Sequence, residues 1–574
     1  MPQDAFTLRV LCEELHATFK GGKINKIVEP SENEVVLTIY TGKKTERLVL
    51  DVNPARPRIG IGGTDAESPL TAPNFCMLLR KHLLNASVEE ISILGFDRIV
   101  KITLLSSAEF SDAKEKILFV ELMGRYSNII LTEDGKILGG NRGINFFDAG
   151  IRPLIVGRKY TLPPTNGKLE PNAENLQEKI CEFLGDNLAE YLCGIVQGIA
   201  TSTAEELILA YEKSLTTAVD KPWKFDKKSA ENFVRFAREF LYNPPKKPCV
   251  IERDEKVVDV CVFPYETVQG KVVEYSTLLL AERDYFTRKI LEKRLKDKTE
   301  RISSVLRAAE KKAQKRLSAV MGKFRDAEDG ETDKINGELI LANVYKIKKG
   351  DKSVTVQNYY DDYKEITIPL NEFLTPAENA ENCYKRYSKK KRTLTSLAPQ
   401  KQKAEEEVAY IRSVLEEFNL CETEEDLDGV LAELKEYGLV KEQSNQKKKK
   451  AQAIGRTYII DGYAVKVGKN NVENDYLTQT ARSKDIWVHS KDYHSAHAII
   501  CYDGKPVLER VIRCTAEIVA YYSKARESGK TEIAYTEKKF VKKPNGAKPG
   551  FCVYTDFKTI TVNSNKHAEF LKSE

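Results

Sequence analysis

The stretch that decides the fold of the C-terminal part is KVGKNNVENDYLTQTARSKDIWVHSKDYHSAH, residues 466–497. Apolar side chains alternate up to Val467, a Gly-Lys-Asn-Asn turn follows, and Asn474 can cap a helix over 475–481. Residues 486–488 have the composition of a short buried strand. Such a strand does not need the polar side chains around it, so we expect a compact α/β segment with a functional role. Its candidate functional residues are Lys469, Asn470, Asn471, Asp485, Trp487 and His489.

A structural explanation competes with the functional one at two of these positions. A histidine on a strand is usually packed or hydrogen-bonded, which applies to His489. Core packing also explains Trp487 more simply than stacking on a ligand does, although Trp487 and Tyr476 could both supply stacking planes. The sequence leaves both alternatives open.

A second motif is the basic run YTEKKFVKKPNGAKPGF at 535–551. Its prolines and glycines predict an open hairpin, so the ammonium groups cannot be dispersed along a helix. A fixed cationic loop of this kind suits a phosphate backbone. The candidate contact residues are Lys538, Lys539, Lys542, Lys543 and Lys548.

Length and composition limit the class of protein. The 574 residues predict three or four domains, and 41% of them are hydrophobic, which is enough to fill the cores. The net charge is only +6 despite 31% charged residues, so binding to nucleic acid would require clustered charge. Eleven cysteines without a CxxC pair argue against a disulfide framework or a structural zinc site. With no basic-then-apolar leader and no apolar run near 18 residues, we expect a cytoplasmic protein without a membrane segment.

Residues 1–170 predict an α+β domain. Helical periodicity over 8–19 ends at two glycines, and alternating runs such as EVVLTIY (34–40) and KILFVELM (116–123) predict strands. Asp134-Gly135 predicts a hairpin turn. The run RIGIGG (58–63) lacks the spacing of a dinucleotide-binding motif and predicts a loop.

Residues 171–245 predict a helical domain. In it, Gly198-Ile199-Ala200 is similar to the turn of a helix-hairpin-helix motif, whose backbone amides commonly hold a phosphate. A plain helical hairpin is the alternative, since the motif alone is weak.

Residues 270–440 predict a long antiparallel coiled coil with a small module at its tip. Apolar residues step by four and three over 302–324 and again over 404–418. Pro399 lies in the returning arm and predicts a kink or a break. Aromatic and basic residues alternate at 384–392, which suits RNA, although a solvated helix face explains them equally. Residues 441–453 predict a basic linker, and 454–574 predict a last α/β domain.

The residues do not predict an enzyme. His489, His494 and His497 lack the cysteine or carboxylate that would complete a zinc site, and neither a nucleophile elbow nor a P-loop is present. Met1-Pro2 invites comparison with DNA glycosylases that use an N-terminal proline, but Gln3 stands where their acidic residue would be. We therefore expect no catalytic residues, no metal and no cofactor.

Taken together, the motifs resemble the NFACT (NEMF/RqcH) family of ribosome quality-control factors, once described as fibronectin-binding protein A-like. VGKNNVENDYLT, DIWVH and the 535–551 run are similar to its C-terminal NFACT-R domain. Segments 6–27, 75–88, 96–102, 119–131 and 156–164 are similar to its NFACT-N domain. One departure is that His494-Ser495-Ala496-His497 stands where the family usually has Pro-Gly-Ser-His.

The resemblance implies a fold and a set of sites. The N-terminal domain would be similar in fold to a DNA-glycosylase N-domain, followed by a helix-hairpin-helix domain, the coiled coil and the α/β NFACT-R domain. Asp97 and Arg98 match a pair implicated in tRNA binding, whereas a turn salt bridge is the alternative. The other RNA-contact residues would be the NFACT-R candidates above together with Glu121, Arg125, Tyr126, Ser127 and Asn128, for which a β-bulge is the alternative reading.

The resemblance also implies an activity. The protein would bind a stalled large ribosomal subunit that carries peptidyl-tRNA and would recruit alanyl-tRNA for template-free C-terminal alanine tailing, which marks the nascent chain for degradation. The ribosome would form the peptide bonds, so the protein would position substrates without being an enzyme. We expect a monomer on the ribosome, with a small RNA-binding factor like RqcP as a possible partner and no membrane. A surface adhesin that binds fibronectin is the competing class.

Overall fold

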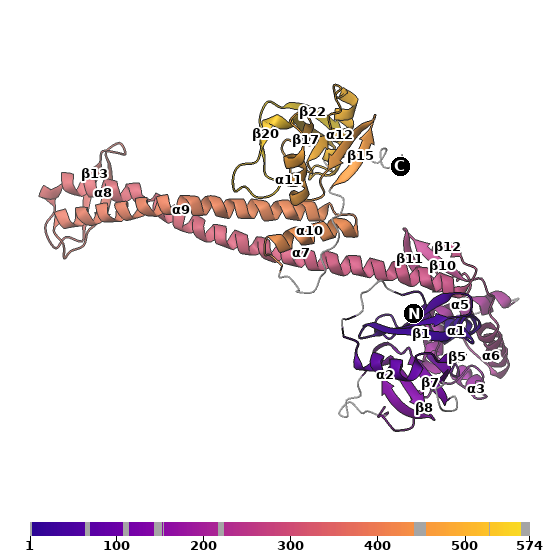
Figure 1. The fold of residues 1–574 in the computed structure, drawn as a ribbon. Helices are drawn as coiled ribbons and strands as arrows, with labels where there is room; N and C mark the ends of the chain where they lie inside the picture. Colours follow the sequence, from indigo (N-terminus) through magenta and orange to yellow (C-terminus); the bar gives the residue numbers. More distant parts are fainter. Residues whose placement is uncertain are drawn as a thin grey trace. The chain divides into compact units, whose positions relative to one another are not determined.

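The computed structural model describes residues 3–63, 69, 71–106, 114–142, 152, 154–215, 223–440, 455–526 and 529–563 (Figure 1). The chain divides into two compact units, Met1–Lys293 and Arg294–Glu574. Helix α7 (Leu278–Glu328) begins in the first unit and ends in the second. Within the described ranges, no helix has an apolar stretch that could cross a membrane. The predicted linker 441–453 lies outside the described residues, and the predicted domain boundaries stay predictions.

The first unit contains a nine-stranded antiparallel sheet in the order β4-β3-β2-β1-β5-β6-β7-β8-β9. Helices α1 (Ala5–Phe19) and α2 (Asn74–Leu83) pack against it, since their apolar side chains belong to the same core as the inward-facing strand residues. The predicted hairpin turn is present, because Asp134 and Gly135 have φ of 50° and 72° between β8 and β9. The strands are β1 Lys23–Ser31, β2 Glu34–Tyr40, β3 Thr45–Asp51, β4 Arg58–Ile61, β5 Ser87–Ile93, β6 Ile99–Ser106, β7 Lys114–Glu121, β8 Asn128–Glu133 and β9 Lys136–Gly140.

The predicted loop at 58–63 was wrong over most of its length. Arg58–Ile61 forms β4 and pairs with β3. The side chain of Gln3 donates to Ile59 O (2.8 Å) and accepts from Ile59 N (2.9 Å), which holds the strand from its other side. These contacts are tertiary, so a local motif could not reveal them.

Among the described residues, four helices, a small sheet and the start of α7 form the rest of the first unit. Helices α4 and α5 are joined by the turn that contains Gly198, while the helix-hairpin-helix assignment stays a prediction. The three-stranded sheet has the order β11-β10-β12. The elements are α3 Leu176–Cys181, α4 Leu188–Ile195, α5 Thr201–Ser214, α6 Lys227–Tyr242, β10 Cys249–Arg253, β11 Lys256–Cys261 and β12 Lys271–Glu274.

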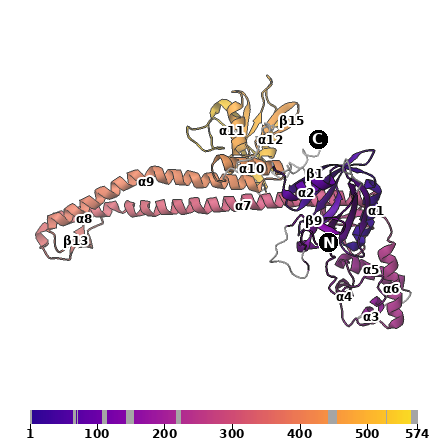
Figure 2. The same cartoon turned by 60° about the horizontal axis from the view of Figure 1, so that its bottom comes forward.

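In the second unit, α7 packs against α9 (Pro376–Asn419) (Figure 2). The ion pairs Arg316–Glu407 (2.6 Å) and Glu310–Arg412 (3.2 Å) show that the two helices run antiparallel. A regular coiled coil along their whole length stays a prediction. Helix α9 continues through Pro399, so the predicted break is absent, whereas the alternative, a kink, stays a prediction. Pro399 is exposed, and water can satisfy the carbonyl that lacks its helical partner.

A small module lies between these helices along the chain. Its apolar residues form a core together with the start of α9. Helix α10 follows α9 and packs against it. The elements are α8 Gly330–Ala342, η2 Val344–Lys346, β13 Ser353–Asn358, β14 Lys364–Pro369 and α10 Glu424–Glu436.

The C-terminal domain is built on a six-stranded antiparallel sheet in the order β15-β16-β18-β17-β19-β22. Val488 faces a core shared with α12, whereas its neighbour Trp487 faces α11 on the opposite side. The elements are β15 Arg456–Ile460, β16 Tyr463–Val467, α11 Asn471–Thr480, β17 Ile486–Ser490, β18 Ala498–Ile500, α12 Glu509–Tyr521, β19 Lys530–Glu537, η3 Lys538–Phe540, β20 Val541–Lys542, β21 Val553–Tyr554 and β22 Lys558–Asn563.

The start of α11 differs from the prediction. Asn470 caps the helix by accepting from Glu473 N (2.9 Å), so the helix begins four residues before the predicted start at 475. Asn474, the predicted cap, is buried, and its Oδ1 accepts from His497 N (2.9 Å). Both asparagines suit a cap, and only the tertiary contact to His497 decides between them.

Candidate nucleic-acid interface

The Asp97 carboxylate joins two turns of the first unit. Its Oδ1 accepts from Arg98 N (2.7 Å), and its Oδ2 accepts from Gln197 Nε2 (2.7 Å). Arg98 is half-buried. The predicted tRNA-binding pair therefore lies beside the turn between α4 and α5.

That turn requires a glycine. Gly198 has φ of +72°, and a Cβ at this position would lie 2.4 Å from Ala5 Cβ and 2.5 Å from Phe96 O. Ala5 N donates to Gly198 O (2.8 Å), and Asp4 Oδ2 accepts from Ala200 N (3.0 Å). The start of α1 and the two turns consequently form one tightly packed assembly.

Glu121 anchors the end of β7 from inside the protein. It is 2% exposed, and its carboxylate makes a bidentate pair with the Arg152 guanidinium at 2.7 and 3.0 Å. Tyr160 donates its hydroxyl to Glu121 Oε1 (2.8 Å), and its ring stacks on Phe119. This geometry supports a role of Glu121 in positioning the loop that follows β7. The predicted RNA contact of Glu121 stays a prediction.

The loop after β7 exposes two of its predicted contact residues. Gly124 has φ of +57° and opens a short 3₁₀ turn, η1 (Gly124–Tyr126), in place of the alternative β-bulge. Arg125 is exposed and lies over the ring of Tyr126, which is 67% exposed. Ser127 and Asn128 are buried; the Ser127 hydroxyl donates to Gly124 O (2.7 Å).

The two N-terminal candidate groups lie next to each other. Leu122 N donates to Arg98 O (2.9 Å), which holds the loop containing Arg125 and Tyr126 beside the start of β6. A guanidinium and an exposed aromatic ring are suited to a phosphate backbone and an unstacked base. The surface at the start of β6 and the end of β7 is therefore the candidate surface of the first unit.

The asparagines at the start of α11 are internal. Asn470 and Asn471 are 4% and 0% exposed. Asn471 Nδ2 donates to Glu433 Oε1 (3.1 Å), and Lys469 N donates to Glu473 Oε2 (3.0 Å). Asn470 Oδ1 accepts from Glu473 N (2.9 Å), so both asparagine side chains are engaged with protein groups, and their predicted RNA contact stays a prediction.

The residues on and beside β17 are also packed inside. Asp485 is buried and accepts from Arg482 N (2.7 Å) and Tyr502 N (2.8 Å). Trp487 is 0% exposed and stacks on the half-buried His489 ring with a centroid distance of 5.3 Å. The packing alternative therefore describes both rings, and Trp487 does not present a stacking plane on the surface.

Three histidines packed in this domain are expected to make it sensitive to acid; His497 is buried, and His489 and His494 are half-buried. Burial lowers the pKa of His489 from 6.5 to about 3 and also lowers the pKa of His494 and His497. Their neutral forms stabilise the fold above pH 6.5, and this contribution is lost as the pH falls toward the folded pKa. We expect the urea midpoint, followed by Trp487 fluorescence in a Trp223→Phe background, to fall from pH 7 to pH 5. His489→Phe should flatten that slope, and an unchanged slope would contradict the assignment.

The basic hairpin is fixed by two of its lysines. Lys543 forms an ion pair with Asp475, whose Oδ1 also accepts from Gly550 N (3.1 Å). The Lys548 ammonium lies 5.0 Å from the centroid of the Tyr437 ring. These contacts give the hairpin a defined position.

The other three lysines differ in their surroundings. Lys539 pairs with Glu537 (2.7 Å), and Lys542 is exposed. Lys538 is half-buried, and its backbone N donates to Asp485 O (2.8 Å). Lys539 and Lys542 are therefore the most accessible cations of the predicted set.

The segment His494-Ser495-Ala496-His497 is held by its own side chains. Ser495 Oγ accepts from Ser490 N (2.9 Å), and His497 Nδ1 hydrogen-bonds to Thr478 Oγ1 (2.8 Å). Both Ser495 and His497 are buried. The segment is consequently a packed part of the domain despite its departure from the family pattern.

Several residues at these surfaces were not predicted. Gln197 directly precedes the turn at 198–200, which was the only local signal for it. Arg456, Lys524 and Arg526 are scattered single cations, and only the fold shows that they face acidic partners. Among the described residues, no group of three or more His, Cys, Asp or Glu side chains is placed to hold a metal ion.

Comparison with known proteins identifies the class. Residues 4–453 match the family model for NFACT N-terminal and middle domains, and residues 456–552 match the NFACT protein RNA binding domain. The chain therefore belongs to the NFACT family, and the resemblance found in the sequence is confirmed.

Within this family, the chain is similar over its length to proteins named Rqc2 homolog RqcH. The identity is 32% to the one from Bacillus subtilis, covering 96% of both chains, and 31% to the one from Streptococcus pneumoniae R6, covering 100% of both. Among solved structures, it is similar to the N-terminal part of the fibronectin/fibrinogen-binding protein from Streptococcus suis, with 27% identity, a TM-score of 0.41, and coverage of 50% of this chain and 98% of that one. This TM-score is too low to decide anything about function.

Proposed function

We propose that the protein is a cytoplasmic ribosome quality-control factor that binds the large ribosomal subunit and RNA. The observation that carries this proposal is the near full-length similarity to RqcH proteins together with the RNA-binding domain at 456–552. In the finer form of the proposal, the subunit holds a stalled peptidyl-tRNA. The protein recruits alanyl-tRNA for C-terminal alanine tailing, alone or with a small RNA-binding factor like RqcP.

In this proposal the chain positions tRNA and the ribosome forms the peptide bonds, so the protein needs no catalytic residue of its own. The surface with Asp97, Arg98, Arg125 and Tyr126 supports such a role. It combines a carboxylate, guanidinium groups and an exposed ring in the hydrogen-bonded loops at the ends of two interior strands, β6 and β7. A rigid surface of this kind can fix the orientation of a bound RNA without chemical participation.

Sequencing of RNA that co-purifies with the tagged protein tests this proposal. We expect large-subunit ribosomal RNA and one enriched tRNA for the parent chain. The Asp97→Ala, Arg98→Ala variant should lose that tRNA about tenfold or more, since removal of a specific nucleic-acid contact costs ~1–3 kcal/mol. Ribosomal RNA without an enriched tRNA in the parent would leave a ribosome-binding factor and discard the tailing mechanism.

Asp97 also holds the neighbouring turn, so a matched control is needed. Gln197→Ala removes the 2.7 Å hydrogen bond to Asp97 but leaves the carboxylate and Arg98 in place. We expect this control to retain most of the tRNA. Equal loss in both variants would assign Asp97 to the packing of the turn and not to tRNA contact.

A further inference from the structure

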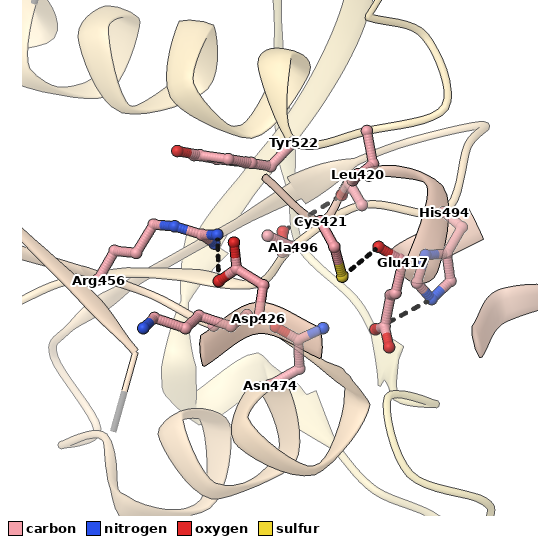
Figure 3. A pocket seen from close by; sticks show the side chains of 12 residues that line it. Glu417, Leu420, Cys421, Asp426, Arg456, Asn474, His494, Ala496 and Tyr522 are labelled. Atoms are coloured by element: carbon pink, nitrogen blue, oxygen red, sulfur yellow. Dashed lines mark hydrogen bonds and ion pairs between the residues drawn. The ribbon is translucent and has the colours of Figure 1, made fainter. Parts of the chain in front are cut away.

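The C-terminal domain packs on an acidic face formed by the end of α9, α10 and the segment between them. Among the described residues, four ion pairs of Lys or Arg cross this contact, and in each the cation belongs to the RNA-binding domain and the carboxylate to the helical side. Figure 3 shows one of them. The pairs are Arg456–Asp426 (2.8 Å), Lys469–Glu425 (3.4 Å), Lys524–Glu416 (2.7 Å) and Arg526–Glu422 (2.9 Å). His494 lies 3.9 Å from Glu417 across the same contact.

Polar and aromatic contacts extend the same surface. Asn471 donates to both Glu433 Oε1 (3.1 Å) and Ser413 Oγ (3.2 Å). Lys548 lies over the rings of Tyr410 and Tyr437 at 5.4 and 5.0 Å. Three of the predicted RNA-contact residues, Lys469, Asn471 and Lys548, are thus in contact with protein at this acidic face.

The phosphates of RNA and the carboxylates of the acidic face bind the same kind of side chain, Lys and Arg. A phosphate backbone binds through Lys and Arg, and a carboxylate already within 3.5 Å of an ammonium weakens its attraction to a second anion. We propose that the acidic face of α9 and α10 is an intramolecular competitor for RNA, which holds the RNA-binding domain in the free chain and releases it when RNA binds. This inference rests on the proposed RNA-binding function.

The types of interaction in this contact allow the RNA-binding domain to separate from the acidic face. Three of the four pairs, all except Arg456–Asp426, include a side chain that is more than a third exposed. Ion pairs of this exposed type contribute little individually and are screened by salt. The contact also leaves a cavity of about 590 Å³ between α9 and the 544–551 loop, lined in part by Tyr410, Ser413, Asn471 and His494. The buried Asn471–Glu433 hydrogen bond also belongs to this contact, but the apolar cores on its two sides are separate clusters. The two sides can therefore separate without exposing a large apolar core.

Zero-length carbodiimide cross-linking of the full chain tests this directly, because it joins ammonium and carboxylate groups in contact. We expect Lys524–Glu416 and Lys469–Glu425 cross-links in the free protein, and at least a fivefold lower yield with saturating unfractionated tRNA. The Lys246–Glu13 pair (2.7 Å) of the first unit is the internal control and should not change. Unchanged cross-links with tRNA bound would overturn this inference alone, whereas no tRNA binding would overturn the proposed function as well.

Two double variants give an independent test. Glu416→Gln with Glu422→Gln removes two carboxylates of the acidic face. We expect tRNA affinity to rise about three- to tenfold, because the form in which the RNA-binding domain is released from the acidic face becomes more populated. Glu310→Gln with Glu407→Gln removes equal charge from the α7–α9 ion pairs and should change affinity less than about twofold. An equal rise in both, or weaker binding in the first, would overturn the competition.

Discussion

Replacing Glu121 with alanine is expected to lower the free energy of unfolding of the first unit by about 3–5 kcal/mol. The reason is that the guanidinium of Arg152, whose side chain is 14% exposed, would remain inside without its bidentate partner. Tyr160 would also lose the acceptor of its hydroxyl. The loop with Arg125 and Tyr126 begins directly after this anchor, so tRNA binding should weaken along with stability.

The two tryptophans make the measurement specific, because one lies in each unit. In a Trp487→Phe background, Trp223 reports urea unfolding of the first unit, whose main core includes it. Tyr160→Phe is the matched control and should cost only about 0.5–1.5 kcal/mol, the usual contribution of one hydrogen bond.

A double-mutant cycle completes the test of this pair. Arg152→Ala in the Glu121→Ala background should cost much less than it does alone, because no buried charge remains unpaired. If the two substitutions lower the free energy of unfolding additively, or if Glu121→Ala lowers it by less than about 1 kcal/mol, the Glu121–Arg152 pair behaves like a solvent-exposed ion pair.

The elements that the sequence predicts well are those decided by neighbours in the chain. Strand alternation and the Asp134-Gly135 turn are local properties, and the structure contains them. The strand at 58–61 depends on Gln3, more than fifty residues away, and the start of α11 depends on which asparagine His497 contacts. Long-range hydrogen bonds of this kind leave no periodic pattern to detect.

The same limit applies to the candidate sites. A polar residue beside a strand can serve a ligand or can complete the fold, and the sequence does not separate the two. Asn471 and Asp485 are buried and hydrogen-bonded inside, whereas Arg125, Tyr126 and Lys542 are exposed. Burial depends on the assembled fold, so only the structure sorts one list of polar candidates into internal anchors and accessible contacts.

Replacing Trp487 with alanine is expected to destabilise the RNA-binding domain by about 3–5 kcal/mol, the usual cost of removing a fully buried large aromatic side chain. Trp487 packs with Leu477, Ile499 and Val541, and its Nε1 donates to no atom of the described residues. Trp487→Phe loses no hydrogen bond and keeps an aromatic ring, so the smaller volume removed should cost less, about 1–2 kcal/mol. Hydrogen exchange of the β17 and β19 amides in the full chain measures both variants.

Binding of tRNA to the same two variants separates packing from base stacking. If Trp487 only packs, the phenylalanine variant binds tRNA like the parent, and the alanine variant loses protection and binding together. Stacking on RNA is worth about 1–3 kcal/mol per base and would weaken binding without changing amide protection. A Trp487→Ala chain with parental exchange rates and weak tRNA binding would therefore contradict the packing role, because a side chain that supports the core cannot be removed while the sheet stays equally protected.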